Sequence, residues 1–184
     1  PPRFRFRPPP DRSRRMTARA EDLPYRPCVG VMLLNPRGEA FVGRRIDRDS
    51  DREGGEAWQM PQGGVDPGED LATAALRELH EETGVEAAEI LAEAGDWLTY
   101  DLPGHLIGVA LKGKYRGQRQ KWFAARFTGT DADIRLDAHE PEFDAWKWAP
   151  VEDLPGLIVP FKRGIYTELV RLFADVARQV RTGG

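Results

Sequence analysis

Residues 63–85 read GGVDPGEDLATAALRELHEETGV, and this segment carries the strongest structural pattern in the chain. Its apolar spacing predicts a helix from about Asp70 to Thr83. Gly84 should end that helix, because glycine readily adopts the left-handed conformation that follows many helices. One arc of the helix is predicted to face the core, and its members are Ala72, Leu76, Leu79 and Thr83.

A second arc of the same helix carries three carboxylates, Glu78, Glu81 and Glu82, at offsets of three and four residues. Like charges at these offsets cost about 0.2–0.5 kcal/mol per pair, and anions near the C-terminal end of a helix cost roughly 0.3–1 kcal/mol. A divalent cation would offset this penalty, and ligation by carboxylates alone suits magnesium or manganese better than zinc. The alternative is a solvated acidic face that Arg77 partly neutralises.

The fixed residues of this segment resemble the Nudix box, which reads Gly, five residues, Glu, seven residues, Arg-Glu-apolar-any-Glu-Glu-any-Gly-apolar. Every fixed position is matched, an agreement that chance produces at about 10^-8 per window. The resemblance implies that Glu78, Glu81 and Glu82 bind the divalent ions and that Arg77 and Glu69 orient the site.

The loop before the helix is expected to meet phosphate. Gly63 and Gly64 should let the backbone approach a phosphate and turn sharply into the helix, and backbone N–H groups before a helix favour anions. The implied reaction is attack of water on a phosphorus of a polyphosphate chain. Metal ions polarise the phosphate oxygens, and a carboxylate accepts the proton of the water.

The pattern outside the box predicts an α/β (α+β) protein in which helices cover the faces of a β-sheet. The resemblance implies the Nudix fold, with a mixed β-sheet sandwiched between α-helices. A second helix is expected from about Phe161 to Val180, on apolar residues at helical spacing. Strands, or short extended segments, are expected at 28–34, 40–44, 58–61, 89–92, 97–100, 107–111, 122–127 and 145–148.

The ends and the composition set the remaining limits. Residues 1–22 are rich in Arg and Pro and are expected to be a disordered extension, with Met16 as the biological start, whereas 23–181 should form a single Nudix domain. The segment 47–56 is acidic and is expected to be a surface loop.

A net charge of -3 and the lack of a long apolar run argue against membrane binding. The lone Cys28 suits an inert core position in a cytoplasmic protein.

The resemblance extends over about 24–177 and is closest to the bacterial RNA pyrophosphohydrolase group, which is itself similar to dinucleoside polyphosphate hydrolases. It rests on YRPCVG (25–30), GRR (43–45), WQMPQGG (58–64), QRQKWF (118–123), PEFDAW (141–146) and VPFKR (159–163).

Residue by residue, this resemblance implies further roles. Glu142 is expected to be a fourth metal ligand or the general base. The residues expected to bind substrate are Arg26, Arg45, Tyr100, Lys121, Phe161 and Lys162. A basic stretch, Lys112, Lys114, Arg116, Arg119 and Lys121, could bind a phosphate chain or an RNA backbone. It could equally be a solvated basic hairpin.

The predicted function is therefore removal of pyrophosphate from the 5' end of triphosphorylated RNA, with Mg²⁺ as cofactor and Mn²⁺ as a possible substitute. The alternative substrate is diadenosine tetraphosphate, cleaved to ATP and AMP. A third interpretation, a catalytically inactive nucleotide-binding module of the same fold, conflicts with the intact set of box glutamates.

Overall fold

The structure is a computed structural model that describes residues 20–46 and 57–183. The eight strands form one mixed β-sheet, with β1 (Tyr25–Leu34) and β7 (Gly117–Phe127) parallel at its centre. All other strand pairs are antiparallel. The sheet order is β3-β2-β1-β7-β5, with β4 beside β1, β6 beside β7 and β8 beside β2.

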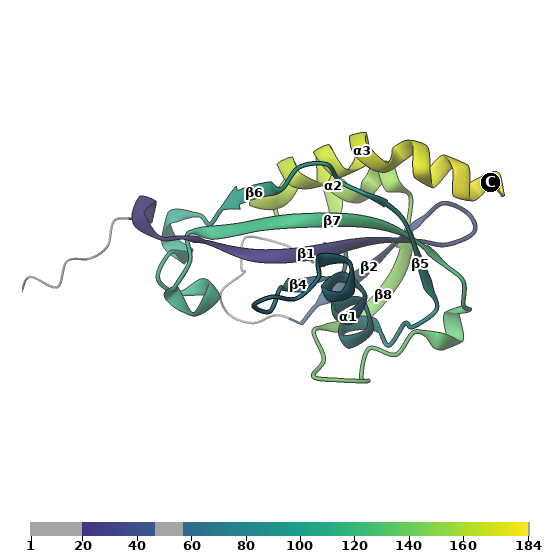
Figure 1. Cartoon of the computed structure of the whole chain (residues 1–184), viewed down its shortest axis with the longest axis horizontal. Helices are drawn as coiled ribbons and strands as arrows, with labels where there is room; N and C mark the ends of the chain where they lie inside the picture. Colours follow the sequence, from purple (N-terminus) through teal and green to yellow (C-terminus); the bar gives the residue numbers. More distant parts are fainter. Residues whose placement is uncertain (1–19, 47–56, 184) are drawn as a thin grey trace, which may run out of the picture.

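Helices cover both faces of this sheet (Figure 1). Helix α1 (Leu71–Thr83) packs into one core cluster, and the long helix α3 (Arg163–Arg181) packs into the other, next to the short helix α2 (Leu154–Leu157). This arrangement confirms the predicted mixed sheet between helices.

The remaining elements are short. The strands are β2 (Ala40–Arg45), β3 (Trp58–Gln59), β4 (Gln62–Gly64), β5 (Ala88–Glu93), β6 (Leu98–Asp101) and β8 (Phe143–Ala149). The 3-10 turns are η1 (Ala20–Asp22), η2 (Gly104–Leu106), η3 (Ala110–Gly113), η4 (Asp131–Asp133), η5 (Val151–Asp153) and η6 (Pro160–Lys162).

Strand β1 is buried on both faces, which explains its continuous apolar sequence. Met32 and Leu34 point into the core beneath α3, whereas Val29, Val31 and Leu33 point into the core beneath α1. The alternation follows from the two-residue period of a strand. One strand therefore holds the two helical layers together.

The register of β1 brings distant segments to one end of the sheet. Arg26 lies opposite Gln118 on β7, and Cys28 lies opposite Gly64 on β4. Because β4 leads directly toward α1, this register fixes the start of the box against the central strands.

Helix α1 has the two ends that the sequence predicts. The carboxylate of Asp70 accepts a hydrogen bond from the backbone N–H of Thr73 at 2.9 Å, and Gly84 has φ +71° and donates its N–H to the carbonyl of His80. The predicted core arc is partly wrong, because Leu76 is 37% exposed whereas Ala75 is fully buried. The helix is rotated so that its acidic side, as well as Leu79, turns inward.

The strand predicted at 107–111 is also wrong. The chain there passes from η2 into η3, and Gly108 has φ +83°. Leu111 and Lys112 both have positive φ, which a strand does not allow. Ile107, Val109 and Leu111 are typical strand residues, but a turn at Gly108, which glycine makes possible, interrupts them.

The predicted extension and loop lie mostly outside the described residues, namely in 1–19 and 47–56. The last three residues of the predicted disordered segment differ from that expectation. Ala20–Asp22 forms a 3-10 turn, and Arg116 donates a hydrogen bond to the carbonyl of Glu21 at 3.2 Å. Among the described residues, no helix has both the length and the apolar character needed to cross a membrane.

Close packing at the centre of the sheet gives a stability test. Gly30→Ala should lower the free energy of unfolding by about 1–3 kcal/mol, because an added Cβ would lie 2.6 Å from the indole ring of the fully buried Trp122. Gly164→Ala on α3 has open space around it and should leave stability unchanged or raise it by up to about 1 kcal/mol. Urea unfolding measures both variants. Equal midpoints for the two would contradict the proposed steric limit at Gly30.

Candidate active site

A cavity of about 480 Å³ lies beside the C-terminal half of α1. Five carboxylates line it. Glu78, Glu81 and Glu82 come from α1, and Glu140 and Glu142 come from the segment that leads into β8. The structure thus brings together the three box glutamates and Glu142, as the sequence predicts.

Cationic and aromatic side chains line the same cavity. Arg26, Arg45 and Lys162 supply the positive charge, and Tyr100 and Phe161 place their ring centroids 5.7 Å apart. The Nζ of Lys162 lies 5.4 Å from the centroid of the Tyr100 ring. The predicted substrate contacts on β1, β2, β6 and η6 therefore share one site with the carboxylates.

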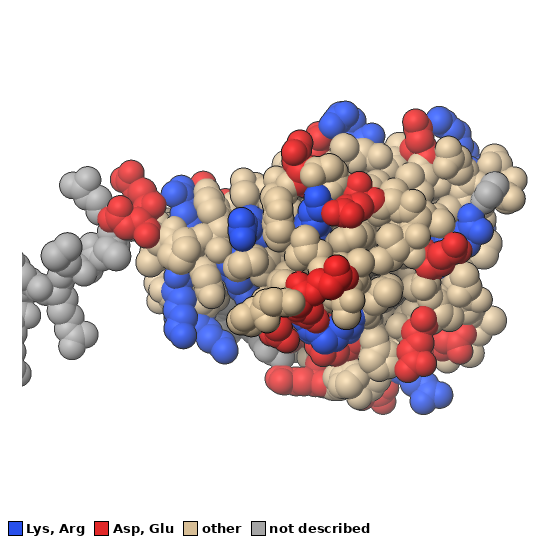
Figure 2. Space-filling view, viewed as in Figure 1, with Lys and Arg blue, Asp and Glu red and all other residues tan. Residues whose placement is uncertain are grey.

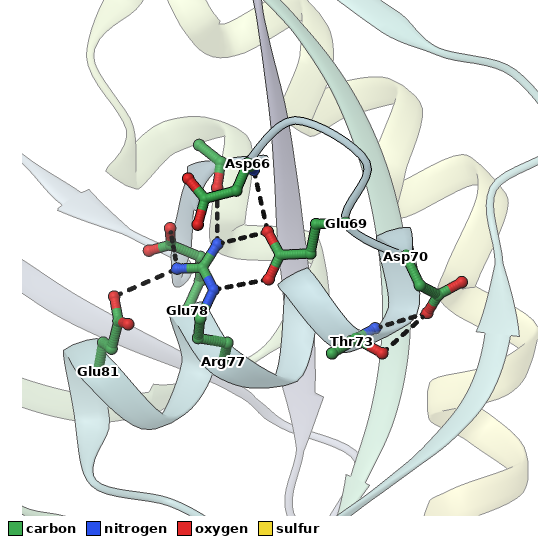
Figure 3. A network of polar contacts seen from close by, with 8 residues as sticks. Asp66, Glu69, Asp70, Thr73, Arg77, Glu78 and Glu81 are labelled. Atoms are coloured by element: carbon green, nitrogen blue, oxygen red, sulfur yellow. Dashed lines mark hydrogen bonds and ion pairs between the residues drawn. The ribbon is translucent and has the colours of Figure 1, made fainter.

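Acidic side chains gather over α1 on the face shown in Figure 2, and one guanidinium lies among them (Figure 3). Arg77 donates to both oxygens of Glu69, from Nε at 2.7 Å and from Nη2 at 2.9 Å. Its Nη2 also donates to the carbonyl of Gly64 at 3.0 Å, which ties α1 to β4. Its Nη1 lies 2.9 Å from Glu78 and 3.4 Å from Glu81. The predicted orienting pair thus contacts two of the three box glutamates.

The environment changes the pKa values of these groups in opposite directions. Hydrogen bonds from Arg77 and from the backbone N–H of Asp66 lower the pKa of Glu69 to about 2. Burial raises the pKa of Glu78 above its ordinary value, although Arg77 opposes the shift. Burial raises the pKa of Glu82 well above its ordinary value, and the charges of Glu78 and Glu142 add to the shift.

Glu82 is the most enclosed carboxylate of the site. Only 7% of the residue is exposed, and its Oε2 accepts a hydrogen bond from the backbone N–H of Gln62 at 3.0 Å. The charge of Arg45 lowers the pKa of Glu82 but does not offset the effect of burial. A positive charge entering the cavity would therefore stabilise its ionised form.

The oxygen-only donors of α1 and of Glu142 fit a hard divalent cation. In this structure Glu78 and Glu81 reach Arg77, and no three acidic, histidine or cysteine side chains of the described residues are gathered as closely as bound metal requires.

The sharp turn predicted at the two glycines that start the box lies elsewhere, whereas their predicted contact with phosphate stays a prediction. Both lie in β4 and line the cavity, and neither has positive φ; the sharp turn falls at Gly68, with φ +76°. A Cβ on Gly63 would collide with the carboxylate of Glu78, and one on Gly64 would lie 2.5 Å from Nη2 of Arg26. The glycines make room for charged side chains.

Lys121 is a correction to the predicted substrate contacts. Its ammonium group donates to the carbonyl of Gly95 at 2.9 Å and lies 3.2 Å from Glu93, outside the cavity. Gln118, three residues earlier on β7, lines the cavity instead. Because side chains alternate along a strand, Gln118 and Lys121 point to opposite faces.

Several residues of the lining, polar and apolar, were not predicted from the sequence. Gln59 and Gln62 flank the Met60-Pro61 pair, in a segment that resembles the family. That resemblance could have identified both glutamines as site residues. Gln120 donates to the side chains of Gln62 and Gln118. The remaining missed residues are His139, Glu140, Leu102, Ala110 and Leu111.

Cys28 has no chemical role in this site. Burial raises the pKa of its thiol to about 11, so the thiol stays protonated and unreactive at neutral pH. The predicted inert core position is confirmed.

Comparison with known proteins identifies close relatives. The sequence profile of the NUDIX domain matches residues 24–169. The RNA pyrophosphohydrolase of Rhizobium meliloti (strain 1021) is 57% identical over 165 residues, which cover 86% of this chain and 99% of that protein. The RNA pyrophosphohydrolase of Agrobacterium fabrum is 56% identical over 168 residues, which cover 88% and 99%.

Solved structures share the same fold. A C. elegans Ap4A hydrolase in a binary complex superimposes with a TM-score of 0.57 at 22% identity, over 82% of this chain and 98% of that one. A MutT protein from Methanosarcina mazei superimposes with a TM-score of 0.56, also at 22% identity, over 82% and 96%.

Because its carboxylate is enclosed, Glu82 should lower the stability of the metal-free protein. Its pKa is raised on folding, so the folded protein retains a proton that the unfolded chain has lost, and stability falls as pH rises above the ordinary value of 4.5. Glu82→Gln should therefore stabilise the metal-free protein, and the gain should grow as pH rises above about 4.5. Urea unfolding in a chelator measures it.

The matched control for this variant is Glu86→Gln. Glu86 lies just beyond α1, and its side chain is 84% exposed. That substitution should not change how stability depends on pH. A Glu82→Gln protein less stable than wild type at the higher pH would contradict the account of the buried charge.

Proposed function

Because the chain belongs to the NUDIX family, we propose that it is a phosphoanhydride hydrolase that removes pyrophosphate from the 5' end of triphosphorylated RNA. The observation that carries the proposal is the shared cavity of the box glutamates, a set of cations and an aromatic pair. The curated relatives named RNA pyrophosphohydrolase support it, since the match covers 99% of their length.

Members of this family generally use divalent metal ions. We assign the metal ligands as Glu78, Glu81, Glu82 and Glu142, and the ion as Mg²⁺, with Mn²⁺ as a substitute. When bound, such an ion polarises phosphate oxygens and lowers the pKa of a coordinated water. The raised pKa values of Glu78 and Glu82 support this assignment, because both carboxylates gain from an added positive charge.

The protein groups around the ion have separate tasks. Arg77, held by Glu69, positions Glu78 and Glu81 and keeps β4 in contact with α1. Glu142 faces them from the segment before β8. We assign Glu142 as the fourth ligand or as the base that takes the proton of the attacking water.

The other residues that line the cavity suit a nucleotide. Tyr100 and Phe161 offer ring faces on which a base can stack, and Lys162 lies over both rings. We assign Arg26 and Arg45, which line the cavity, to the phosphate oxygens, because guanidinium groups bind such oxygens in a forked geometry. The cavity thus has aromatic rings for a base and cations for a phosphate chain, together with the carboxylates.

Diadenosine tetraphosphate is the second candidate substrate. The aromatic pair favours it equally, because a stacked nucleoside does not have to be joined to RNA. The inactive-module interpretation is disfavoured by the complete set of box glutamates in the cavity. As part of the same proposal the enzyme acts in the cytoplasm, where a reducing environment suits its buried, unpaired Cys28.

A two-substrate assay tests the proposal. With Mg²⁺ present, triphosphorylated RNA should be converted to RNA with a 5' monophosphate and released pyrophosphate, and a chelator should stop the reaction. Diadenosine tetraphosphate at a matched concentration should be hydrolysed less efficiently. Turnover of the dinucleotide alone would contradict the RNA assignment, and turnover of neither would contradict the hydrolase.

The same assay includes a test of the carboxylates. Glu81→Gln should lower kcat on either substrate by about 100-fold or more, since it removes a charged donor from the metal site. The control is again Glu86→Gln, which lies outside the cavity and should retain wild-type activity. Equal activities for the two variants would exclude Glu81 from the site.

A further inference from the structure

The segment between β6 and β7 forms a flap beside the aromatic end of the cavity. It contains η2 and η3, and its Ala110 and Leu111 line the cavity together with Tyr100 and Phe161. The flap is closed on itself, because Gly113 packs so near the carbonyl of Gly108 that an added Cβ would lie 2.7 Å from it.

The backbone of the flap is strained where it passes the cavity. Leu111 and Lys112 are the only non-glycine residues with positive φ in 20–46 and 57–183, at +52° and +59°. Such conformations are unfavourable for residues with a Cβ and persist where the surrounding structure requires them. Leu111 lines the cavity, and Lys112, the next residue, is exposed.

The contacts divide the five cations of the basic stretch into two groups. Three have partners. Arg116 pairs with Asp101 and lies over the Tyr25 ring, Arg119 lies over the Trp97 ring, and Lys121 pairs with Glu93.

Lys112 and Lys114 form the second group. Both are exposed, and neither forms an ion pair with an acidic side chain of the described residues. Figure 2 shows Lys and Arg side chains gathered at the end of the molecule where Figure 1 places the turns before β7.

We propose that Lys112 and Lys114 bind the phosphodiester groups of RNA beyond the nucleotide held in the cavity. This inference rests on the proposed function. Leu111 lines the cavity together with Tyr100 and Phe161, so an RNA chain that leaves the cavity on this side passes the segment that carries Lys112 and Lys114. Two uncompensated ammonium groups on this segment suit a single strand, which carries one negative charge per phosphate.

The same geometry separates the two candidate substrates. A dinucleoside polyphosphate has no phosphodiester chain beyond its nucleosides, so Lys112 and Lys114 add nothing to its recognition. RNA gains two ionic contacts that are independent of base sequence. The flap thereby favours RNA without changing the carboxylate end of the site.

The test is a double substitution, Lys112→Gln with Lys114→Gln, assayed at fixed excess Mg²⁺. On triphosphorylated RNA of about ten nucleotides, kcat/KM should fall about three- to ten-fold. The slope of log(kcat/KM) against log salt should become shallower by about 1.4, since each contact to a single strand contributes about 0.7. The rate on diadenosine tetraphosphate should not change.

Two further variants make the result specific. Arg171→Gln with Arg178→Gln removes the same net charge from exposed positions on α3 and should retain the wild-type rate on RNA. Lys112→Arg with Lys114→Arg keeps the charge and should also retain it, which separates loss of charge from damage to the strained flap.

The outcomes are distinct from those of the proposed function. No loss on RNA, an equal loss on both substrates, or an equal loss in the α3 control would overturn the assignment of the flap. Failure of the unmodified protein to hydrolyse RNA would instead overturn the proposed function, on which the flap assignment depends.

Discussion

A single guanidinium holds the acidic side of α1 against the central sheet. Three glutamates at adjacent helical positions repel one another, and they lie in the half of the helix whose dipole also disfavours anions. Arg77 offsets both effects, since it contacts Glu78 and Glu81 while Glu69 and the carbonyl of Gly64 fix its position. The rest of the site is arranged around that contact.

Burial and charge act against each other in the cavity. Glu82 is nearly enclosed and has a strongly raised pKa, yet its backbone partner, Gln62, is the residue that begins β4. Gly63 and Gly64 then leave space for Glu78 and Arg26. The segment is thus shaped to bring charged groups close together. A divalent ion would complete the balance of charge and link it to phosphate at the same place.

The sequence predicts the local features of this site better than the long-range ones. The start of the helix near Asp70 and its end at Gly84 depend on contacts between residues three or four positions apart, so spacing was sufficient. The roles of Arg77 and Glu69 came from the family resemblance, and the two side chains are in contact. The exposure of Leu76 depends instead on how the whole helix is rotated against the sheet. The partner of Lys121 depends on which strand face meets Gly95, and the turn that replaces the strand expected at 107–111 depends on contacts between Gly108 and Gly113.

The central claim is that the carboxylates of α1 gather a hard divalent ion in the cavity that Tyr100 and Phe161 also line. Anomalous diffraction from crystals soaked with Mn²⁺ tests it most directly, because the ion is located by its own scattering. The account predicts an anomalous peak bounded by carboxylate oxygens of Glu78, Glu81 and Glu82. A well-ordered crystal with no peak in this cavity, or with Mn²⁺ bound only elsewhere, would contradict it.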